Sequence, residues 1–451
     1  MNKSAAAGGL SVKQKLGFGI FDLGGNMFFT LMGFWTLNFL TDTVGLAAAL
    51  SGVAVMAGKI WDAVTDPVMG FISDRTLSRW GRRRPYLLFG ALPMLLSMWF
   101  FFTKPAFSGS LALTVWATLA LMLLNTAATV INIPYSSLTP ELTGDYHERT
   151  SLNGYRFGCA IFGTILGAAV VQPLVDIFPS KARGFSMTGL ILGTVMLITT
   201  LLTFFGTRER VHTKADLPTG SLLATYRAVF SNKPFLLLLL TYAFHIMALT
   251  FLQSILVYYT RYVYSSHPAD LTTIAMLILL LTAMVFIPIS VLVSKRIGKK
   301  RTYQICFVII ASACLIIFTL GHILGPNFFM SMMVYAGIGV GFSYVAPYAM
   351  IPDAIDFDAV KTGQRNEGAY YGMWTFISKL GTALSVFLSG LILSLGGYIA
   401  DAVQSPKTIL AIRLLIGPIP AVIFIAALGV IQLYPLDEKS CRGIRQERAK
   451  T

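Results

Sequence analysis

Residues 271–294 read LTTIAMLILLLTAMVFIPISVLVS, a run of apolar and small polar side chains that contains no charged residue. A helix rises 1.5 Å per residue, so a run of this length crosses the roughly 30 Å hydrocarbon core of a bilayer. Unpaired backbone groups are not tolerated in hydrocarbon, and the run therefore predicts a membrane-spanning helix rather than a strand. Basic residues follow it directly, at Lys295, Arg296, Lys299, Lys300 and Arg301.

The same alternation of apolar runs and polar breaks extends over the whole chain. Of the 451 residues, 55% are apolar and only 12% are charged, which is too few charges to cover a soluble protein of this size. We expect an all-α membrane protein with twelve transmembrane helices. The expected spans are 16–41, 47–73, 86–103, 111–138, 153–174, 186–206, 234–261, 271–294, 302–324, 328–351, 367–397 and 410–434.

Lysine and arginine are concentrated in alternate loops, such as the segment 75–84 and the segment 295–301. Such residues accumulate in loops that stay in the cytoplasm, so we expect both termini to be cytoplasmic in an inner or plasma membrane. The net charge of +15 is explained by contact with anionic membrane lipids rather than with nucleic acid. The polar start of the chain, residues 1–15, does not have the pattern of a cleavable leader.

The longest polar break, residues 207–233, divides the expected helices into six and six. We expect an N-terminal bundle over 1–206, a cytoplasmic linker loop over 207–233, a C-terminal bundle over 234–435 and a cytoplasmic tail over 436–451. Three weak matches support a duplication: Gly81-Arg82-Arg83-Arg84 with Gly298-Lys299-Lys300-Arg301, Pro134-Tyr135 with Pro347-Tyr348, and Tyr155 with Tyr370. Two such bundles can rock about a central solute site, which favours transport.

Two acids stand one helical turn apart in the second expected span, in Lys59-Ile60-Trp61-Asp62-Ala63-Val64-Thr65-Asp66-Pro67. Positions i and i+4 share a helix face, and two carboxylates there cannot both stay ionised in low dielectric without a counter-charge. Either one carries a proton or a cation binds between them. Thr65 adds a hydroxyl oxygen, a ligand that hard cations prefer. The alternative is a structural Lys59–Asp62 ion pair, with Asp66 capping toward the cytoplasm.

The fourth expected span carries Thr126, Thr129 and Asn132 at three-residue spacing. This polar face can meet the second span and add oxygen ligands to the cation site, and Pro134 frees a backbone carbonyl nearby. The alternative is that these small polar residues join neighbouring helices.

Ionisable and aromatic residues in other spans are candidates for solute binding, because an ionisable group within a membrane asks for a partner or a task. The candidates are Asp22, Asn26, Arg156, Trp374 and Lys379. Lys379 lies in the opposite half of the chain from Asp62 and Asp66, and its ammonium group can compensate the negative charge of these two acids. Trp374 can offer its face to a sugar ring or can simply pack, and Arg156 can bind solute or extend to the membrane surface.

A cytoplasmic gate is expected where the second span ends, at Gly70, Asp74, Arg75, Arg79 and Arg82. Guanidinium groups there can pair with acids of the other bundle, among them Asp353 and Glu367, and so hold one conformation. The alternative is that the arginines only set the orientation of the chain in the membrane.

The pattern G-x-x-x-D-R-x-x-x-R-x-G-R-R at 70–83 resembles the loop 2/3 motif of the major facilitator superfamily. The segments 60–67, 133–138 and 363–368, with Lys379, resemble the glycoside-pentoside-hexuronide:cation symporters, the melibiose permease group. The resemblance covers about residues 14–435. It implies the major facilitator fold, with two six-helix bundles.

By this resemblance Asp62 and Asp66 match the helix-2 acids of the family's cation site, Thr129 matches its helix-4 hydroxyl, and Arg156 and Lys379 match basic residues of helices 5 and 11. Asn132 stands in place of a further acid, Thr65 in place of an amide, and Asn26 in place of a sugar-binding acid. Ser136 replaces a tryptophan of the sugar site, so melibiose itself is not the expected substrate.

We therefore expect a secondary active symporter that couples uptake of a sugar, glycoside or hexuronide to Na⁺ or H⁺. The alternative is a cation-coupled transporter or flippase for lysolipids or other amphiphiles, because the animal lysolipid symporters look similar around Asp62 and Asp66. A receptor or scaffold that transports nothing is a weaker rival. Enzymatic motifs such as G-x-S-x-G and H-E-x-x-H are absent from the sequence, so we expect no catalytic residues, no cofactor and no bound metal other than a transported monovalent cation.

Overall fold

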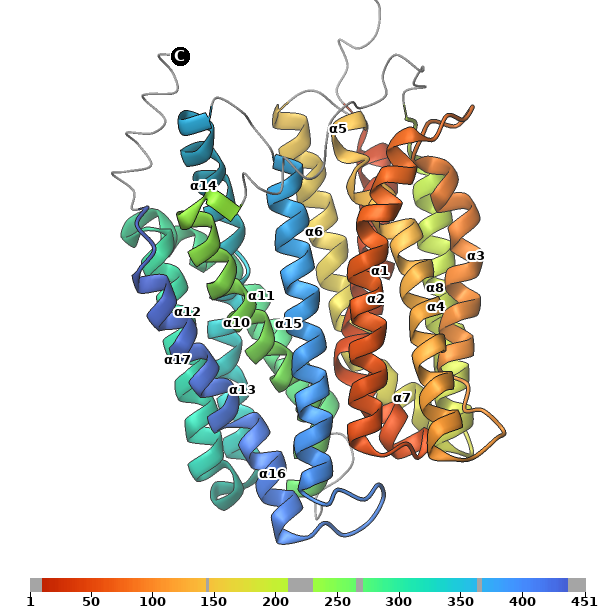
Figure 1. The fold of residues 1–451 in the computed structure, drawn as a ribbon, viewed down its shortest axis with the longest axis vertical. Helices are drawn as coiled ribbons and strands as arrows, with labels where there is room; N and C mark the ends of the chain where they lie inside the picture. Colours follow the sequence, from red (N-terminus) through yellow and green to blue (C-terminus); the bar gives the residue numbers. More distant parts are fainter. Residues whose placement is uncertain (1–9, 143–145, 210–229, 265–270, 363–366, 437–451) are drawn as a thin grey trace, which may run out of the picture. The chain divides into compact units, whose positions relative to one another are not determined.

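The structure, a computed structural model, describes residues 10–142, 146–209, 230–264, 271–362 and 367–436. Among these residues every regular element is a helix (Figure 1). The first part of the chain forms α1 (Val12–Asn38), the π-helical turn η1 (Phe39–Val44), α2 (Ala48–Arg75), α3 (Arg84–Phe101), α4 (Ser110–Ser136), α5 (Thr139–Leu142), α6 (Tyr146–Ala169), α7 (Val171–Asp176) and α8 (Lys181–Gly206).

The second part forms α10 (Lys233–Tyr258), the π-helical turn η3 (Tyr259–Val263), α11 (Leu271–Ile297), α12 (Lys299–Ile316), the π-helical turn η4 (Ile317–Gly321), α13 (His322–Ser343), α14 (Ala346–Thr362), α15 (Glu367–Leu395), α16 (Pro406–Ile416) and α17 (Pro418–Gln432). All the expected spans fall on helices. Three of them, 153–174, 328–351 and 410–434, are each interrupted between two helices. In the last one Pro418 has no N–H to donate, so the helix ends at Ile416 and restarts as α17.

Eight helical segments of the described residues are long and apolar enough to cross a membrane. The prediction of an all-helical membrane protein is confirmed, whereas the count of twelve stays a prediction. α1, α2 and α6 are not among the eight. These are the helices in which polar residues such as Asp22, Asp62 and Arg156 replace apolar ones.

The first of two compact units comprises the described residues within 1–32 and 64–219. In it α3 packs against both α4 and α8 (Figure 1). α6 approaches α1 backbone to backbone, because a Cβ at Gly163 would overlap the carbonyl of Leu23, and one at Gly167 would overlap the carbonyl of Met27. Only glycine permits this approach. It packs the second half of α6 against the middle of α1.

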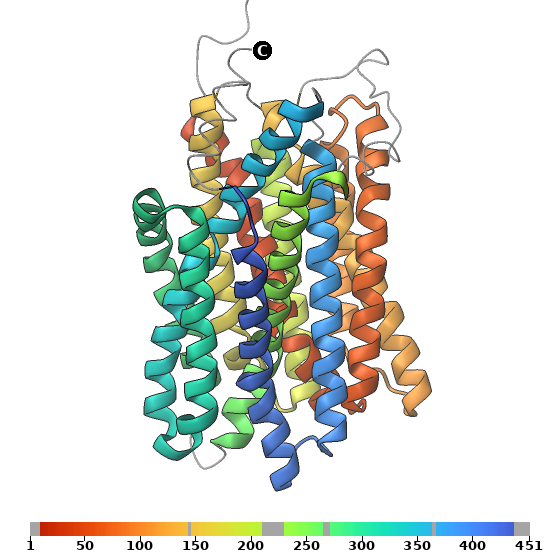
Figure 2. The same ribbon diagram turned by 60° about the vertical axis from the view of Figure 1, so that its left-hand side comes forward.

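The second compact unit comprises the described residues within 33–63 and 220–451. α10 packs against α15 and α17, and α13 packs against α11 and α12 (Figure 2). The early part of α2 also belongs to this unit and contacts α15 closely, since a Cβ at Gly52 would lie 2.9 Å from the carbonyl oxygen of Phe387. The predicted domain limits stay predictions, and residues 210–229 of the predicted linker lie outside the described residues.

The weak internal repeat corresponds to one local backbone feature that occurs in both halves of the chain, a glycine with a positive φ angle before a helix. Gly81 and Gly298 both have positive φ angles, 99° and 88°, and each stands just before a helix, α3 and α12 respectively. This region of backbone space is accessible mainly to glycine. At Gly81 a side chain would also overlap the carboxylate of Glu209, which accepts hydrogen bonds from the backbone N–H groups of Arg83 and Arg84 at the start of α3.

Candidate functional site

An ion pair lies inside the first unit between α1 and α6. The Nε atom of Arg156 donates to Oδ2 of Asp22 at 2.7 Å, and its Nη2 atom donates to Oδ1 at 3.3 Å. The side chains of Arg156 and Asp22 are 24% and 14% exposed, so the pair is mostly buried but still accessible to water. Such a two-point contact fixes the plane of both groups. Two of the predicted solute-binding residues are therefore in direct contact, 134 positions apart in sequence.

Tyr135 of α4 completes this cluster. Its hydroxyl donates to Oδ2 of Asp22, and the Arg156 guanidinium lies 4.9 Å from the centre of its ring. Tyr135 is not among the residues predicted to bind solute, although its place in the repeated Pro-Tyr pair is a signal for it. Asn26, predicted to bind solute, donates its amide N–H to the backbone carbonyl of Asp22 at 2.9 Å. Its carbonyl oxygen remains an acceptor on the same helix as Asp22.

The two acids of α2 have different partners. Asp66 accepts a hydrogen bond at 2.9 Å from the hydroxyl of Thr129 on α4, so two predicted cation ligands are in contact. Asp62 is buried, and its Oδ1 atom lies 2.9 Å from the ammonium of Lys379 on α15. Lys59 is farther from this carboxylate, at 3.9 Å. Lys379 therefore supplies the nearer counter-charge for Asp62, and the local Lys59–Asp62 pair of the alternative interpretation is the weaker contact.

The other predicted cation ligands are half-buried. Asn132 donates its amide N–H to the carbonyl of Ala128 at 2.9 Å, within α4. Thr65 follows Asp62 by three residues on α2. In the described residues no group of three or more His, Cys, Asp or Glu side chains is arranged to hold a metal ion. Carboxylate, hydroxyl and amide oxygens are nevertheless the kind of ligand that hard cations such as Ca²⁺ and Mg²⁺ take.

Trp374 of α15 is buried, with 3% of its surface exposed. Its ring stacks on Tyr242 of α10, with 3.8 Å between the ring centres and 18° between the planes. The hydroxyl of Tyr242 is in turn 3.1 Å from that of Tyr348. One face of the indole is thus occupied by a protein side chain, and its use as a platform for a sugar stays a prediction.

The predicted gate residues of the first unit make local contacts. Asp74 pairs with Arg83 at 3.0 Å, and Arg83 also donates to the carbonyl of Ser137 at the end of α4. The guanidinium groups of Arg75 and Arg79 lie over the rings of Phe71 and Trp80, at 3.6 and 4.4 Å. Gly70 is half-buried on α2, and Arg82 precedes α3.

In the second unit Asp353 of α14 pairs with Lys299 of α12, which also donates to the carbonyl of Ala349 at 2.7 Å. This contact is similar in kind to the Arg83 contact, because each basic residue lies within two residues of a repeated glycine and bonds a carbonyl shortly after a Pro-Tyr pair, although the repeat aligns Lys299 with Arg82. The side chain of Glu367, the other predicted acid of the gate, lies outside the described residues.

The family model described as "MFS/sugar transport protein" matches residues 17–438. A putative sulfoquinovose importer of Escherichia coli (strain K12) is 30% identical over 447 residues, which cover 95% of this chain and 92% of the relative. An isoprimeverose transporter of Lactiplantibacillus pentosus is 27% identical and covers 94% of this chain and 89% of its own.

Solved structures give the same fold at low sequence identity. A bacterial homologue of the human lysosomal transporter Spinster, in an inward-facing and unoccupied conformation, superposes with a TM-score of 0.72 at 13% identity, covering 97% of this chain and 99% of that one. The nucleoside transporter NupG has a TM-score of 0.65 at 15% identity, with 92% of this chain and 98% of that one covered.

Proposed function

This chain belongs to the MFS/sugar transport protein family, in the melibiose permease-like group of the major facilitator superfamily, and we propose that it couples uptake of a sugar or glycoside to Na⁺ or H⁺. It is an integral membrane transporter. The observation that carries the coupling proposal is the pairing of the two α2 acids, Asp62 with Lys379 and Asp66 with Thr129. A carboxylate inside a membrane helix is costly, and each of these is held by groups that suit a site for positive charge.

The cation binds, in this proposal, to the carboxylates of Asp62 and Asp66, with oxygen ligands from Thr65, Thr129 and Asn132. Lys379 is the resident positive charge on Asp62 before the cation arrives. A cation that attracts Asp62 competes with the ammonium group, so its binding releases Lys379 for a new contact. This exchange supplies a physical link between ion and solute, because both then favour the same arrangement of side chains.

The solute binds at the cluster of Asp22 and Arg156, with Asn26, Lys379 and the ring of Trp374 contributing. A carboxylate, a guanidinium and an amide together accept and donate hydrogen bonds, which is the chemistry that recognises sugar hydroxyls. The relatives named for sulfoquinovose and isoprimeverose support a sugar or a sugar derivative as the substrate. An anionic derivative is compatible with Arg156 once its bond to Asp22 opens.

The chain is further proposed to form twelve transmembrane helices in two bundles, over 1–206 and 234–435. The linker 207–233, the tail 436–451 and both termini lie on the cytoplasmic side of a bacterial inner membrane. Gly70, Asp74, Arg75, Arg79 and Arg82, with Asp353 and Glu367, form the cytoplasmic gate. The concentration of Lys and Arg in alternate loops supports this orientation.

The test is uptake of labelled sugars into liposomes that contain the purified protein. Neutral glycosides, hexuronates, a sulfonated sugar and a lysophospholipid are each supplied under an inward Na⁺ gradient, an inward H⁺ gradient or neither. Accumulation of a sugar under one gradient supports the proposal, and accumulation of the lysophospholipid alone supports the rival function. Asp66→Asn is expected to abolish accumulation, whereas Asp176→Asn, a change at an exposed carboxylate of α7, is the matched control. Accumulation by Asp66→Asn equal to that of the control would contradict the assigned site.

A further inference from the structure

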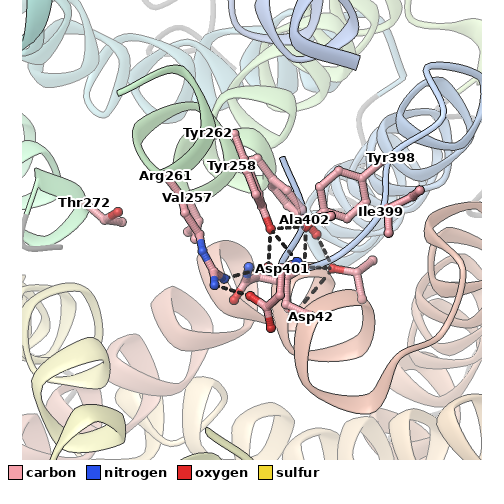
Figure 3. A network of polar contacts seen from close by, with 12 residues as sticks. Asp42, Val257, Tyr258, Arg261, Tyr262, Thr272, Tyr398, Ile399, Asp401 and Ala402 are labelled. Carbon is pink, nitrogen blue, oxygen red and sulfur yellow. Dashed lines mark hydrogen bonds and ion pairs between the residues drawn. The ribbon is translucent and has the colours of Figure 1, made fainter. Parts of the chain in front are cut away.

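A second charged cluster lies at the end of the second unit where α1 turns into α2 (Figure 3). Its centre is Asp42 of η1, whose side chain is 1% exposed. The carboxylate accepts hydrogen bonds from Arg261 at 2.8 Å, from Tyr262 at 3.1 Å and from the hydroxyl of Tyr398. We call Asp42, Arg261, Tyr262 and Tyr398 the Asp42 cluster. None of these residues is among those predicted to bind solute, to bind the cation or to form the cytoplasmic gate.

The cluster joins three separate stretches of the chain. Asp42 follows α1, Arg261 and Tyr262 end the α10 segment, and Tyr398 and Asp401 lie in the loop between α15 and α16. The hydroxyls of Tyr262 and Tyr398 are 2.8 Å apart, so the donors to Asp42 also hold one another. A single acid therefore fastens the α1–α2 turn to both α10 and the α15–α16 loop.

The bonds of this cluster can be exchanged for water. Arg261 is 34% exposed and also pairs with Asp401, which is 46% exposed, so one side of the cluster faces solvent. By contrast, the adjoining contact of α2 with α15 is backbone to backbone at Gly52. Charged and hydroxyl groups lose little when water replaces a protein partner, whereas a lone Asp42 carboxylate in its buried position would be strongly unfavourable. The cluster is thus stable while its members bond one another, and water can take the place of these bonds if its members separate.

Tyr398 remains a hydroxyl donor at ordinary pH. Burial, together with the nearby Tyr258 and Asp42, raises the pKa of its phenol well above the usual range. Ionisation of the phenol would place a negative charge against the carboxylate of Asp42. The hydrogen bond from Tyr398 therefore persists across the pH range in which a transporter works.

We propose that the Asp42 cluster is the latch that closes the extracytoplasmic side of the transporter, and that it opens once in each transport cycle. The inference rests on the proposed transport function and topology, which put the α1–α2 turn on the outer face. In this proposal the α1–α2 turn separates from the α15–α16 loop to admit solute from that face. Breaking the bonds of Asp42 permits that separation.

The experiment measures the distance between these two segments without any substrate. Spin labels are attached at Ala47→Cys in the turn and at Val403→Cys in the loop, both exposed positions, after the four native cysteines have been replaced. The protein is placed in lipid nanodiscs, and the distance distribution is recorded by pulsed electron paramagnetic resonance. The parent is expected to show one short-distance population. Asp42→Asn is expected to enlarge a longer-distance population at least tenfold.

Asp401→Asn is the matched control, because it removes an exposed acid from the same arginine, and it is expected to leave the distribution close to that of the parent. An unchanged distribution in Asp42→Asn, or an equal change in Asp401→Asn, overturns the proposal. If Asp42→Asn does not fold, Tyr398→Phe replaces it. Loss of that single hydroxyl is expected to enlarge the long-distance population by a smaller factor, and no enlargement overturns the proposal.

The distance measurement separates this inference from the function on which it rests. If Asp42→Asn enlarges the long-distance population but the parent accumulates no sugar under any gradient, the latch proposal stands and the symporter proposal is refuted. If the parent accumulates sugar but Asp42→Asn leaves the distances unchanged, the symporter proposal stands and the latch proposal is refuted.

Discussion

Replacement of Arg156 by methionine tests the ion pair that anchors the proposed solute site. The change keeps the apolar stem of the side chain and removes its charged guanidinium, so Asp22 retains only its bond from Tyr135. Breaking a fully buried pair costs about 3–5 kcal/mol, whereas an exposed pair contributes about 0–1 kcal/mol. The side chains here are 24% and 14% exposed, which places this pair between those limits. We expect a loss of about 2–3 kcal/mol of stability.

The assay is thermal unfolding of purified protein in detergent, together with sugar uptake in liposomes. A loss of about 2–3 kcal/mol corresponds to a fall of about 4–12 °C in Tm for a unit of some 190 residues, from about 2–4 °C per kcal/mol. Uptake is expected to be lost, because the guanidinium is also a proposed ligand. Tyr135→Phe, which removes one hydrogen bond to the carboxylate, is expected to cost about half as much stability.

The double variant Asp22→Asn with Arg156→Met decides whether the pair acts as a unit. Removing both charges leaves no stranded carboxylate, so we expect stability to recover to within about 1 kcal/mol of the parent while uptake stays absent. A double variant whose loss equals the sum of the two single losses would refute the reasoning, because the residues would then be energetically independent.

Three further changes test other contacts. Thr129→Val removes the hydroxyl that bonds Asp66 and is expected to weaken cation stimulation of uptake about tenfold, which corresponds to one charged hydrogen bond of roughly 1.5 kcal/mol; an unchanged cation dependence argues against that ligand. Gly81→Ala meets both a positive φ and the Glu209 carboxylate, so thermal unfolding is expected to reveal a loss of about 1–3 kcal/mol. Gly154→Ala, in open space within α6, is the control and is expected to lose no stability, because alanine favours a helix more than glycine does. Lys379→Gln leaves Asp62 without its nearer cation, and we expect tighter cation binding in a scintillation proximity assay together with lost solute coupling; weaker cation binding would contradict competition between the two.

The helices and the chemistry of their polar residues were predictable because a membrane restricts what a chain can do. Backbone groups in hydrocarbon must pair within a helix, so each long apolar run such as 271–294 indicated one. Charges in hydrocarbon are costly, so Asp22, Asp62 and Arg156 stood out as residues with a task. The breaks within three spans were harder to place, since a helix can tolerate a proline, as α2 does at Pro67, or end beside one, as α16 does before Pro418.

The sequence by itself determined which charged residues lie in the membrane-spanning segments, but only the tertiary structure decided which residues they contact. Asp22 finds Arg156 because glycines of α6 let that helix touch α1, an approach that depends on both helices at once. No role for Asp42 follows from the sequence, because this residue comes directly after the apolar run 16–41, at a place where a charged side chain can meet water at no cost. Folding then buries that carboxylate under Arg261 and two tyrosines, and only burial makes an acid at the end of a helix demand partners.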